Sequence, residues 1–307
     1  MLLSVIIPTY NRCEILKECL TALFHQTLPK RDYEVIVVDD GSKDNTKATV
    51  KKLQKKHSNL FYFYKKNQGQ GIARNFGFEK AKGGVVVFIG DDIIVIKDFL
   101  NEHLRYHLRF TRENEAVLGF ITWHPKLVIN SFMRWMTNGS AIFGRFGGHQ
   151  FAYEKLAGKT EADFNFFYTS NISLKREIIE KKEDQFDSDF GSYGWEDIEL
   201  GYRLYKKYGL KIFYNEKALG YHYHELDEST LERRMFMIGK SAHIIHSKHP
   251  ELNKVPGKIK QICFRILGSL PVIGFIWSIN KFTKNKFLAL YFYALSKRYF
   301  MKGFLSR

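Results

Sequence analysis

The sequence predicts an α/β protein whose central sheet is parallel and carries helices on both faces. Over the first third of the chain, short apolar segments alternate with longer segments of helical periodicity. The apolar segments are hydrophobic at nearly every position, which is typical of strands buried on both faces. Strands and helices in alternation predict βα units, and therefore parallel strands between two layers of helices.

The expected strands are runs of Val, Ile, Leu and aromatic residues that end at turn-forming or polar residues. They are Leu2–Ile7, Val35–Val38, Leu60–Tyr64 and Val85–Ile89. After the first strand, Asn11 and Glu14 resemble a capping box that opens a helix running to about His25. Two more helices are expected between the later strands, Asp44–His57 and Gly71–Ala81.

Polar side chains gather just beyond three of these strands. In open sheets of this class, ligands bind outside the carboxyl ends of the strands. The residues there are Thr9, Asn11 and Arg12, then Asp39-Asp40-Gly41-Ser42, then Asp91 and Asp92. The second group could equally be an ordinary turn, because Asp, Gly and Ser all suit turns.

The adjacent carboxylates of Asp91 and Asp92 repel each other unless a cation or hydrogen-bond donors offset the charge. A hard divalent ion bound to phosphate oxygens is the usual reason for such a pair. The segment Gly69–Asn75 resembles a dinucleotide loop, but Arg74 replaces the third glycine of that motif. This substitution argues against a nicotinamide cofactor and for a diphosphate near Arg74.

Acidic residues crowd a second region, Gly194–Arg203, where a helix is expected from Trp195 through Lys207. Neighbouring Glu196 and Asp197 point about 100° apart on such a helix, so they have different roles. One suits a general base for a substrate hydroxyl, while the other caps the helix or holds the acceptor. Gly201, one turn from Asp197, indicates a close approach to the backbone there. The alternative is that acidic residues simply favour a helix N-terminus.

Taken together, these motifs resemble those of family 2 glycosyltransferases, which have the GT-A fold. The resemblance covers about residues 1 to 225, and its motifs occur in the family's order. They are Val5–Asn11, Val37–Ser42, Gly71–Asn75, Asp91-Asp92, Thr169–Ser173 and Gly194–Arg203.

The resemblance implies a role for each donor-side residue. Asp39 would contact the base, Pro8, Thr9 and Arg12 would line the nucleoside, and Arg74 would lie near the diphosphate. In the family's Asp-x-Asp metal motif, the first position here is Gly90 and the last is Asp92. Asp92 is therefore the expected metal ligand and Asp91 the expected ribose contact.

A histidine pair could complete that metal site. His222 and His224 alternate with tyrosines after an expected strand, so both face one side. They could also be a surface pair. Carboxylate, imidazole and phosphate oxygen together suit Mn²⁺ or Mg²⁺. The resemblance implies a metal-binding histidine here, without distinguishing between the two.

The resemblance implies an inverting transfer from a nucleoside diphosphate sugar, expected to be UDP-linked, to a glycan or lipid-linked glycan. Asp197 would be the general base, because the second acid of the pair has that role in similar transferases; Glu196 is the alternative. Trp195 could stack on a sugar ring or pack in the core. Asn171 is expected to position the acceptor.

The composition divides the chain of 307 residues, which carries a formal net charge of +16. The expected parts are a nucleotide-sugar-binding half at 1–118, an acceptor-binding and catalytic half at 119–225, and a basic helical tail at 226–307. That tail holds fifteen Lys or Arg and four Asp or Glu, a net charge of +11.

The tail has the composition of a segment that lies on a membrane surface. Its apolar stretches, Ile259–Ile279 and Phe287–Tyr299, are aromatic, interrupted and flanked by lysines. Leu267–Ile279 is too short for a span, which needs about 20 apolar residues. Such a segment suits the interface of an anionic leaflet. The alternative, compatible with the first, is a helical subdomain packed on the catalytic core.

The opening residues lack the features of a signal peptide, and three cysteines suggest no disulfide framework. The expected location is therefore cytoplasmic, peripheral on the inner face of the cell membrane.

Two other classes of protein explain parts of the pattern. A nucleic-acid-binding protein would explain the charge, but these basic residues flank apolar runs, so no nucleic acid is expected. A glycoside hydrolase would use paired carboxylates without Asp39, Arg74 and Asp92.

Overall fold

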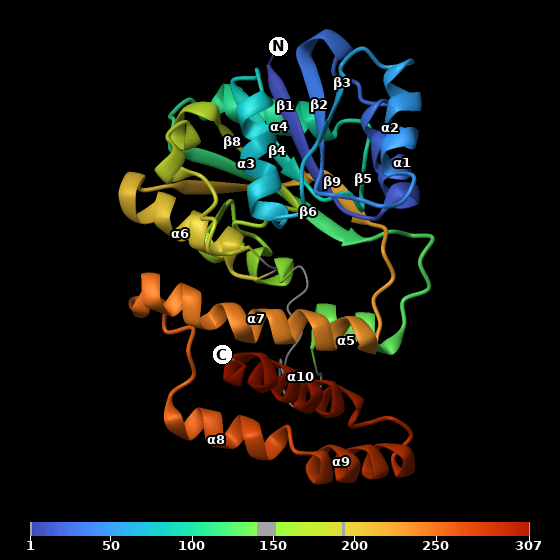
Figure 1. The fold of residues 1–307 in the computed structure, drawn as a ribbon, viewed down its shortest axis with the longest axis vertical. Helices are drawn as coiled ribbons and strands as arrows, with labels where there is room; N and C mark the ends of the chain where they lie inside the picture. The colour runs from blue at the N-terminus through green and yellow to red at the C-terminus, as the bar shows by residue number, and fades with distance from the viewer. Residues whose placement is uncertain (1, 140–151, 192–193, 307) are drawn as a thin grey trace. The chain divides into compact units, whose positions relative to one another are not determined.

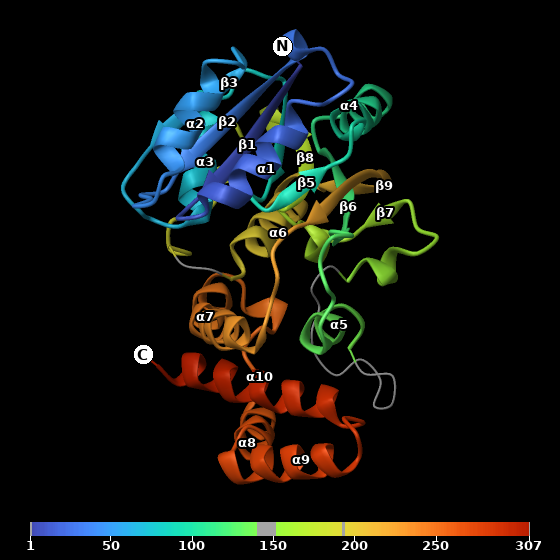
Figure 2. The same ribbon diagram turned by 90° about the vertical axis from the view of Figure 1, so that its right-hand side faces the viewer.

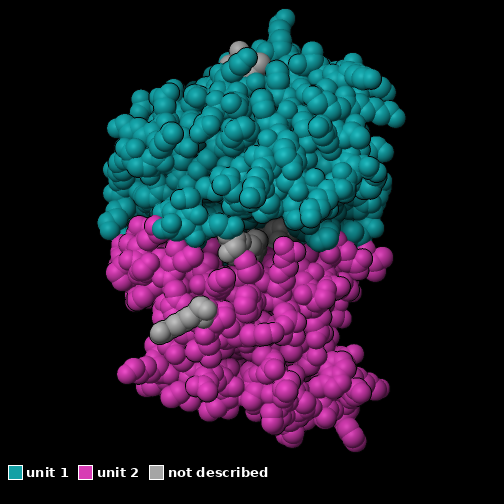
Figure 3. Space-filling view, viewed as in Figure 1, with its two compact units in different colours: residues 1–127, 153–191, 196–224 teal, residues 128–152, 192–195, 225–307 magenta. Residues whose placement is uncertain are grey.

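The computed structural model describes residues 2–139, 152–191 and 194–306. They form two compact units, which are coloured separately in Figure 3. The first comprises Met1–Leu127, Tyr153–Gly191 and Glu196–His224. The second comprises Val128–Ala152, Ser192–Trp195 and Glu225–Arg307. The division at residues 118 and 225 expected from the sequence stays a prediction; the chain enters the second unit at Val128, at Ser192 and, for the last time, at Glu225.

The first unit is built on a mixed sheet with the strand order β3-β2-β1-β4-β8-β6-β9-β5, and β7 pairs with β9. All four strands expected from the sequence are present, as β1 to β4. The strands are β1 Leu3–Thr9, β2 Tyr33–Asp39, β3 Leu60–Tyr64, β4 Val85–Ile89, β5 Ile93–Val95, β6 Glu115–Trp123, β7 Glu161–Ala162, β8 Asn171–Lys175 and β9 Lys211–His222.

The expected parallel pairing runs unbroken through the first half of this order and recurs once in the second half, between β6 and β9. β1 pairs in parallel with β2 and β4, and β2 pairs in parallel with β3. β8 then runs antiparallel to both β4 and β6. β1 and β2 are buried at every position, which is why their sequences show no alternation of apolar and polar residues.

Helices cover both faces of the parallel part, as expected (Figure 1). The connections from β1 to β2 and from β2 to β3 run toward the same edge, so right-handed crossovers place their helices on one face. The connection to β4 returns across the sheet, and its helix covers the other face. These helices are α1 Cys13–Leu23, α2 Thr46–Gln54 and α3 Gln70–Lys80.

The capping box expected at Asn11 and Glu14 is absent. Asn11 has a positive φ of 53°, and its Oδ1 accepts a hydrogen bond from the Lys43 backbone N–H at 2.7 Å. Helix α1 begins only at Cys13, whose backbone N–H donates to Asp44 Oδ2 at 3.0 Å. Asn11 therefore shapes the loop between β1 and α1 rather than capping the helix.

A buried polar cluster joins helix α4 (Phe99–Arg109) to β8; this helix packs on β6, β8 and β9 (Figure 2). His103 Nε2 lies 2.9 Å from Asn171 Oδ1, and His103 Nδ1 lies 2.8 Å from Ser173 Oγ. Asn171 Nδ2 donates to the carbonyls of Ala218 at 2.8 Å and Phe120 at 3.1 Å. Burial lowers the pKa of His103 to about 4, so its ring is neutral at pH 7.

Helix α6, Glu196–Tyr208, begins one residue later than the sequence predicts. Trp195 has a positive φ of 69° and so lies outside the helix. A Cβ on Gly201 would lie 2.5 Å from the Phe167 Cβ. The close approach expected at Gly201 is therefore made by the protein's own segment around Phe167 and not by a ligand.

The second unit is helical in its described part. α10 contacts α7, α8 and α9, and lies between α7 and the α8–α9 pair (Figures 1 and 2). α7 and α10 cross at two glycines, because a Cβ on Gly239 would collide with the Phe300 carbonyl and one on Gly303 with the Phe236 carbonyl. The helices are α5 Ser131–Asn138, α7 Glu228–Lys248, α8 Lys258–Leu267, α9 Leu270–Phe282 and α10 Leu288–Leu305.

In the part of the chain that the structure describes, no single helix is both long and apolar enough to cross a bilayer. α8 and α9 pass that test only as a pair, and the pair is bent by 53°. This agrees with the interrupted apolar pattern of Ile259–Ile279.

Candidate active site

Parallel pairing aligns the polar residues that follow the strands. Thr9 at the end of β1 is in register with Asp39 at the end of β2. Thr9 Oγ1 also donates a hydrogen bond to Asp91 Oδ2 at 2.8 Å, just beyond β4. Pro8, the residue before Thr9, is buried inside β1. Three of the sequence segments that were expected to meet at the sheet edge do so.

Arg12 lies between the two adjacent carboxylates. Its Nη1 is 2.8 Å from Asp91 Oδ1 and 2.8 Å from Asp92 Oδ2. Burial alone would lower the pKa of Arg12, but Asp92 and Asp91 outweigh it and raise that pKa. The guanidinium of Arg12 thus supplies positive charge that offsets the two carboxylates, a role that the sequence analysis gave to a metal ion. Arg12 contacts the acidic pair, and its expected place beside the nucleoside stays a prediction.

Asp92 also faces a histidine. Ile93 is paired with His222 across β5 and β9, and this register brings His222 Nε2 to 3.5 Å from Asp92 Oδ2. Burial would raise the pKa of Asp92, but His222 and Arg12 hold it below its ordinary value. The ring of His224 is centred 6.2 Å from that of His222.

The donor atoms near Asp92 fit part of a metal site. A carboxylate oxygen and an imidazole nitrogen converge, and both atom types suit Mn²⁺. Within the described residues, no group of three His, Cys, Asp or Glu is arranged to hold an ion. The donors fit an ion whose coordination is completed by phosphate oxygens, as in sites where a metal is bound by one or two protein groups and the substrate.

Asp39 is fixed by two donors. Its Oδ1 accepts a hydrogen bond from the Ser42 backbone N–H at 2.7 Å, and its Oδ2 accepts one from the Tyr62 hydroxyl at 2.7 Å. Burial, and then Asp39 itself, raises the pKa of Tyr62, so the phenol stays protonated. Each carboxylate oxygen has a second lone pair and can still accept a donor from a ligand.

Arg74 on α3 is a buried cation whose donors are only partly used. Its Nη2 donates to Gln70 Oε1 at 3.3 Å, while Nε and Nη1 are buried without a hydrogen-bond partner among the described residues. Its guanidinium lies 5.5 Å from the centre of the Phe186 ring. Burial lowers the pKa of Arg74, opposed by nearby carboxylates. Because buried donors are normally satisfied, these atoms indicate an anionic ligand.

The two acids at the start of α6 have different environments, as their angular separation predicts. Gln70 Nε2 donates a hydrogen bond to Glu196 Oε1. Asp197 Oδ1 accepts one from the Ile198 backbone N–H at 2.9 Å. Burial, and then the charge of Glu196, raises the pKa of Asp197 to about 7, and Arg74 opposes this rise. A carboxylate with that pKa is suited to general-base catalysis near neutral pH.

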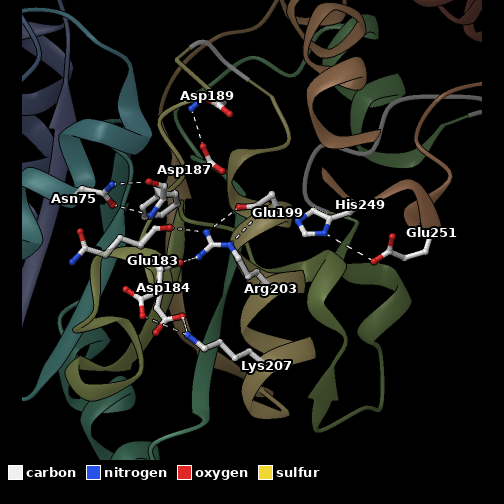
Figure 4. Close-up of polar contacts among 12 residues, drawn as sticks. Asn75, Glu183, Asp184, Asp187, Asp189, Glu199, Arg203, Lys207, His249 and Glu251 are labelled. Atoms are coloured by element: carbon white, nitrogen blue, oxygen red, sulfur yellow. Dashed lines mark hydrogen bonds and ion pairs between the residues drawn. The ribbon is translucent and has the colours of Figure 1, made fainter. Parts of the chain in front are cut away.

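The segment of residues 185–186 is hydrogen-bonded to both α3 and α6, the helices that carry Arg74 and Asp197 (Figure 4). Arg203 of α6 is paired with Glu199 at 2.9 Å and donates to the Gln185 carbonyl at 2.6 Å. Asn75 of α3 donates to the Phe186 carbonyl at 2.7 Å and accepts from the Phe186 N–H at 2.9 Å. The segment 185–186 is therefore bound from both helices.

The two expected acceptor contacts have other partners. Asn171 is fully buried, and its amide is committed to His103, Phe120 and Ala218. This corrects the expected role of Asn171, because the side chain has no exposed polar atom to offer an acceptor. Trp195 belongs to the second unit, where its Nε1 donates to the Ile238 carbonyl at 3.1 Å.

The sequence analysis assigned no role to Gln70, Tyr62 or Asp40, although Asp40 is part of a motif that it recognised. Gln70 bonds to both Arg74 and Glu196. Asp40 accepts hydrogen bonds from Lys65 Nζ and the Gly69 N–H, each at 2.8 Å, and so fixes the loop before α3. The neighbouring motif residues were recognised, but a single sequence does not indicate which residues between them bond across the site.

The fold and the residues at the strand ends define a GT-A-type α/β protein. Residues 4–179, more than half of the chain, match the model of glycosyl transferase family 2. The chain belongs to this family, which confirms the resemblance and the expected fold class.

Two relatives show the extent of the sequence similarity. Validoxylamine A glucosyltransferase from Streptomyces hygroscopicus subsp. jinggangensis is 29% identical over 234 residues, which cover 71% of this chain and 54% of the relative. Dolichyl N-acetyl-alpha-D-glucosaminyl phosphate 3-beta-D-2,3-diacetamido-2,3-dideoxy-beta-D-glucuronosyltransferase from Methanococcus voltae is 28% identical over 230 residues, covering 72% of this chain and 66% of the relative. The chain thus spans about half to two thirds of the length of these relatives.

Two solved structures share the fold over nearly the whole chain. The mannosyltransferase PcManGT from Pyrobaculum calidifontis, in complex with GDP-Man and Mn²⁺, has a TM-score of 0.59 at 18% identity and covers 96% of this chain and 86% of its own. Residues 1–349 of S. aureus TarS, in complex with UDP, have a TM-score of 0.54 at 20% identity, covering 98% and 89%. At these identities the likeness concerns the fold.

Proposed function

We propose that this protein transfers a sugar from a nucleoside diphosphate sugar to an acceptor hydroxyl, with inversion at the anomeric carbon. The observation that carries the proposal is Arg74, a buried cation with unused donors, close enough to influence the pKa of Asp197. An anion-binding group and a general base are the two functions that such a transfer requires. Membership of glycosyl transferase family 2 supports the same reaction.

In this proposal the donor lies along the carboxyl edge of β1, β2 and β4. Asp39 accepts a hydrogen bond from the base, Pro8 and Thr9 line the nucleoside, and Asp91 binds the ribose. Arg12 orients the two carboxylates of Asp91 and Asp92. We propose UDP as the nucleotide; TarS was solved with UDP and the mannosyltransferase with GDP-Man.

The chemical step follows from the charges. An acceptor hydroxyl attacks the anomeric carbon as its proton passes to Asp197, and the bond from that carbon to the diphosphate breaks. Arg74 donates hydrogen bonds to the departing diphosphate as its negative charge grows. Attack opposite the leaving group inverts the configuration. Glu196, held by Gln70, is proposed to bind the acceptor, and it is the alternative base.

Asp92 would hold a divalent metal, Mn²⁺ or Mg²⁺, with His222 as the nearer of the two histidines and His224 as the other candidate. Such an ion would neutralise charge on the diphosphate oxygens. The neighbouring mannosyltransferase was solved with Mn²⁺, which supports a divalent metal.

We propose a glycan or a lipid-linked glycan as the acceptor. The relative from Methanococcus voltae is named for a dolichyl-phosphate-linked sugar acceptor, and the basic second unit suits an anionic membrane surface. Transfer at the inner, cytoplasmic face of the membrane is part of this proposal.

A thermal-shift screen of nucleoside diphosphate sugars, with and without Mn²⁺, tests the proposed function. A donor at about 100 times its Kd should stabilise the protein by roughly 2.7 kcal/mol. Product analysis with the stabilising donor then tests transfer and the anomeric configuration. Hydrolysis of a free glycan without any nucleotide would instead indicate a glycoside hydrolase, and the proposal would be abandoned.

Replacing Asp92 with Ala is expected to remove the Mn²⁺-dependent part of donor affinity, at least about tenfold, because a metal ligand is lost. Isothermal titration calorimetry with and without Mn²⁺ measures this. Glu113, an exposed carboxylate, provides the matched Glu113→Ala control. Undiminished metal-dependent affinity in Asp92→Ala would exclude Asp92 as a ligand.

The α8–α9 pair exposes a surface suited to an anionic leaflet. Phe275 is 65% exposed, Phe282 is 95% exposed and Trp277 is 39% exposed. Residues 258–305 contain nine Lys or Arg and no Asp or Glu. Exposed aromatic side chains beside cations are typical of helices that lie in the membrane interface.

The double variant Phe275→Ser/Phe282→Ser is expected to lower partitioning onto anionic vesicles by at least about tenfold, since each buried Phe contributes about 1.5–3 kcal/mol. Flotation with vesicles of phosphatidylglycerol and phosphatidylcholine measures the bound fraction. Leu108→Ser, at a residue of the first unit that is 70% exposed, serves as the control. Equal flotation of both variants would place the membrane contact elsewhere.

A further inference from the structure

The second unit contains a groove between α8 and α10 that the proposed transfer does not use. Its volume is about 380 Å³. Three cationic side chains line it, Arg265, Arg298 and Lys302. Three apolar side chains line it as well, Phe264, Met301 and Leu305. We call this cavity the α8–α10 groove.

The α8–α10 groove has a strong excess of positive charge. Among the described residues, no carboxylate lines it. Arg298 Nη1 donates to the Gly268 carbonyl at 3.3 Å, which uses one of the five N–H donors of a guanidinium. Lys302 Nζ lies 3.1 Å from Glu232 Oε1, in an exposed pair that contributes little stability.

A fourth cation stands beside the groove. Lys297 Nζ lies 4.9 Å from the centre of the Phe264 ring. Burial, and then the charge of Lys260, lowers the pKa of Lys297 to about 8. Lys302 has a carboxylate partner in Glu232 of α7, but α8, α9 and α10 themselves bring these positive charges together and contain no Asp or Glu. An anion bound in the groove would relieve this repulsion.

The apolar side chains in and around the groove favour an amphiphilic ligand over a simple ion. On α8, Ile259, Ile262 and Ile266 are 80%, 57% and 61% exposed. They follow one another at helical spacing and form one apolar row. These isoleucines do not line the groove, but they make the helix that borders it apolar on its exposed side. A ligand with both a phosphate and a hydrocarbon portion would use the cations and the apolar wall of the groove.

We propose that the α8–α10 groove binds the phosphate headgroup of an anionic phospholipid. Arg265, Arg298 and Lys302 donate to the phosphate oxygens, and the glycerol and first methylenes lie against Phe264, Met301 and Leu305. This proposal rests on the proposed membrane location and adds a specific lipid site to it. Arginines suit such a site because their planar donors bind phosphate bidentately.

The test uses the full chain and dihexanoyl phosphatidic acid kept below its critical micelle concentration, with inorganic phosphate as the comparison ligand. Calorimetry is expected to give at least tenfold weaker lipid binding for Arg265→Gln/Arg298→Gln than for the native chain. Lys281→Gln/Lys284→Gln removes the same charge at exposed positions outside the groove, and its affinity should stay within twofold of the native value. Inorganic phosphate should bind more weakly than the lipid.

Three outcomes would overturn the proposal. An equal loss in the two double variants would indicate diffuse charge, equal affinity for phosphate and lipid would indicate a free-phosphate site, and absent lipid binding would exclude the site. Donor-induced stabilisation of the same variants is measured in parallel. Because it reports the first unit alone, failure of the lipid site and failure of the proposed transfer are distinguished.

Discussion

Replacing Asp197 with Asn should slow sugar transfer by about 10² to 10⁴ fold while leaving donor affinity nearly unchanged. The amide keeps the size of the carboxylate and can still accept the hydrogen bond from the Ile198 N–H, but it cannot take the proton of the acceptor hydroxyl. Single-turnover rates and donor dissociation constants separate the two effects. Glu196→Gln is the matched control, expected to weaken acceptor binding more than the chemical step. Near-native transfer by Asp197→Asn with a slow Glu196→Gln would reverse the assignment.

The pH dependence gives this prediction a second readout. The pKa of Asp197 is raised to about 7, so the native transfer rate should increase as pH rises through about 7. The unfolded chain releases this proton near pH 3.8, and the folded protein retains it to higher pH. Stability should therefore fall as pH rises from about 4 to 7. Asp197→Asn lacks this loss, so its stability relative to the native protein should increase over that window in thermal melts.

Replacing Arg74 with Met should lower donor affinity by about 10 to 150 fold, because charge-assisted hydrogen bonds contribute about 1.5–3 kcal/mol. The free protein should stay folded, since a buried cation with unused donors is replaced by an apolar side chain of similar length. Arg74 also opposes the rise in the pKa of Asp197, so its removal should shift the pH profile to higher pH. Calorimetry and the pH profile measure these effects.

Arg105→Met is the control for this change, because Arg105 has a side chain 58% exposed and lies on α4. It should leave both donor affinity and the pH profile unaltered. Full donor affinity in Arg74→Met would mean that the unused donors of Arg74 serve no ligand.

The parallel half of the fold was predictable because its strands are buried on both faces. β1 to β4 follow directly from their apolar runs, and the polar residues after them could be placed at one edge. β8 was not among the expected strands because it begins with Asn171 and is interrupted by Ser173, although both are fully buried. Their partners, His103 and His107, lie far away in the sequence. Such pairings depend on tertiary structure, and hydrophobic periodicity carries no information about them.

The sequence predicted where the residues of the candidate site lie, but not which of them contact one another. The carboxylates of Asp91 and Asp92 indicated a missing positive charge, but the sequence could not show that Arg12 would supply it from the loop after β1. Gly201 indicated a close approach, which proved to be Phe167. In both cases the pattern identified a physical requirement correctly, while the group that meets it came from a distant segment.

The binding of segment 185–186 by both Arg203 and Asn75 has a consequence for how this enzyme family can diversify. The separation of Arg74 on α3 from Asp197 on α6, the proposed base, is fixed by this segment of the first unit. Residues elsewhere can then change to admit new acceptors without altering that separation. Conversely, a substitution at Arg203 would release α6 from segment 185–186 and so change the separation of Arg74 from Asp197. Catalysis would then change although Arg203 itself has no proposed contact with the substrate.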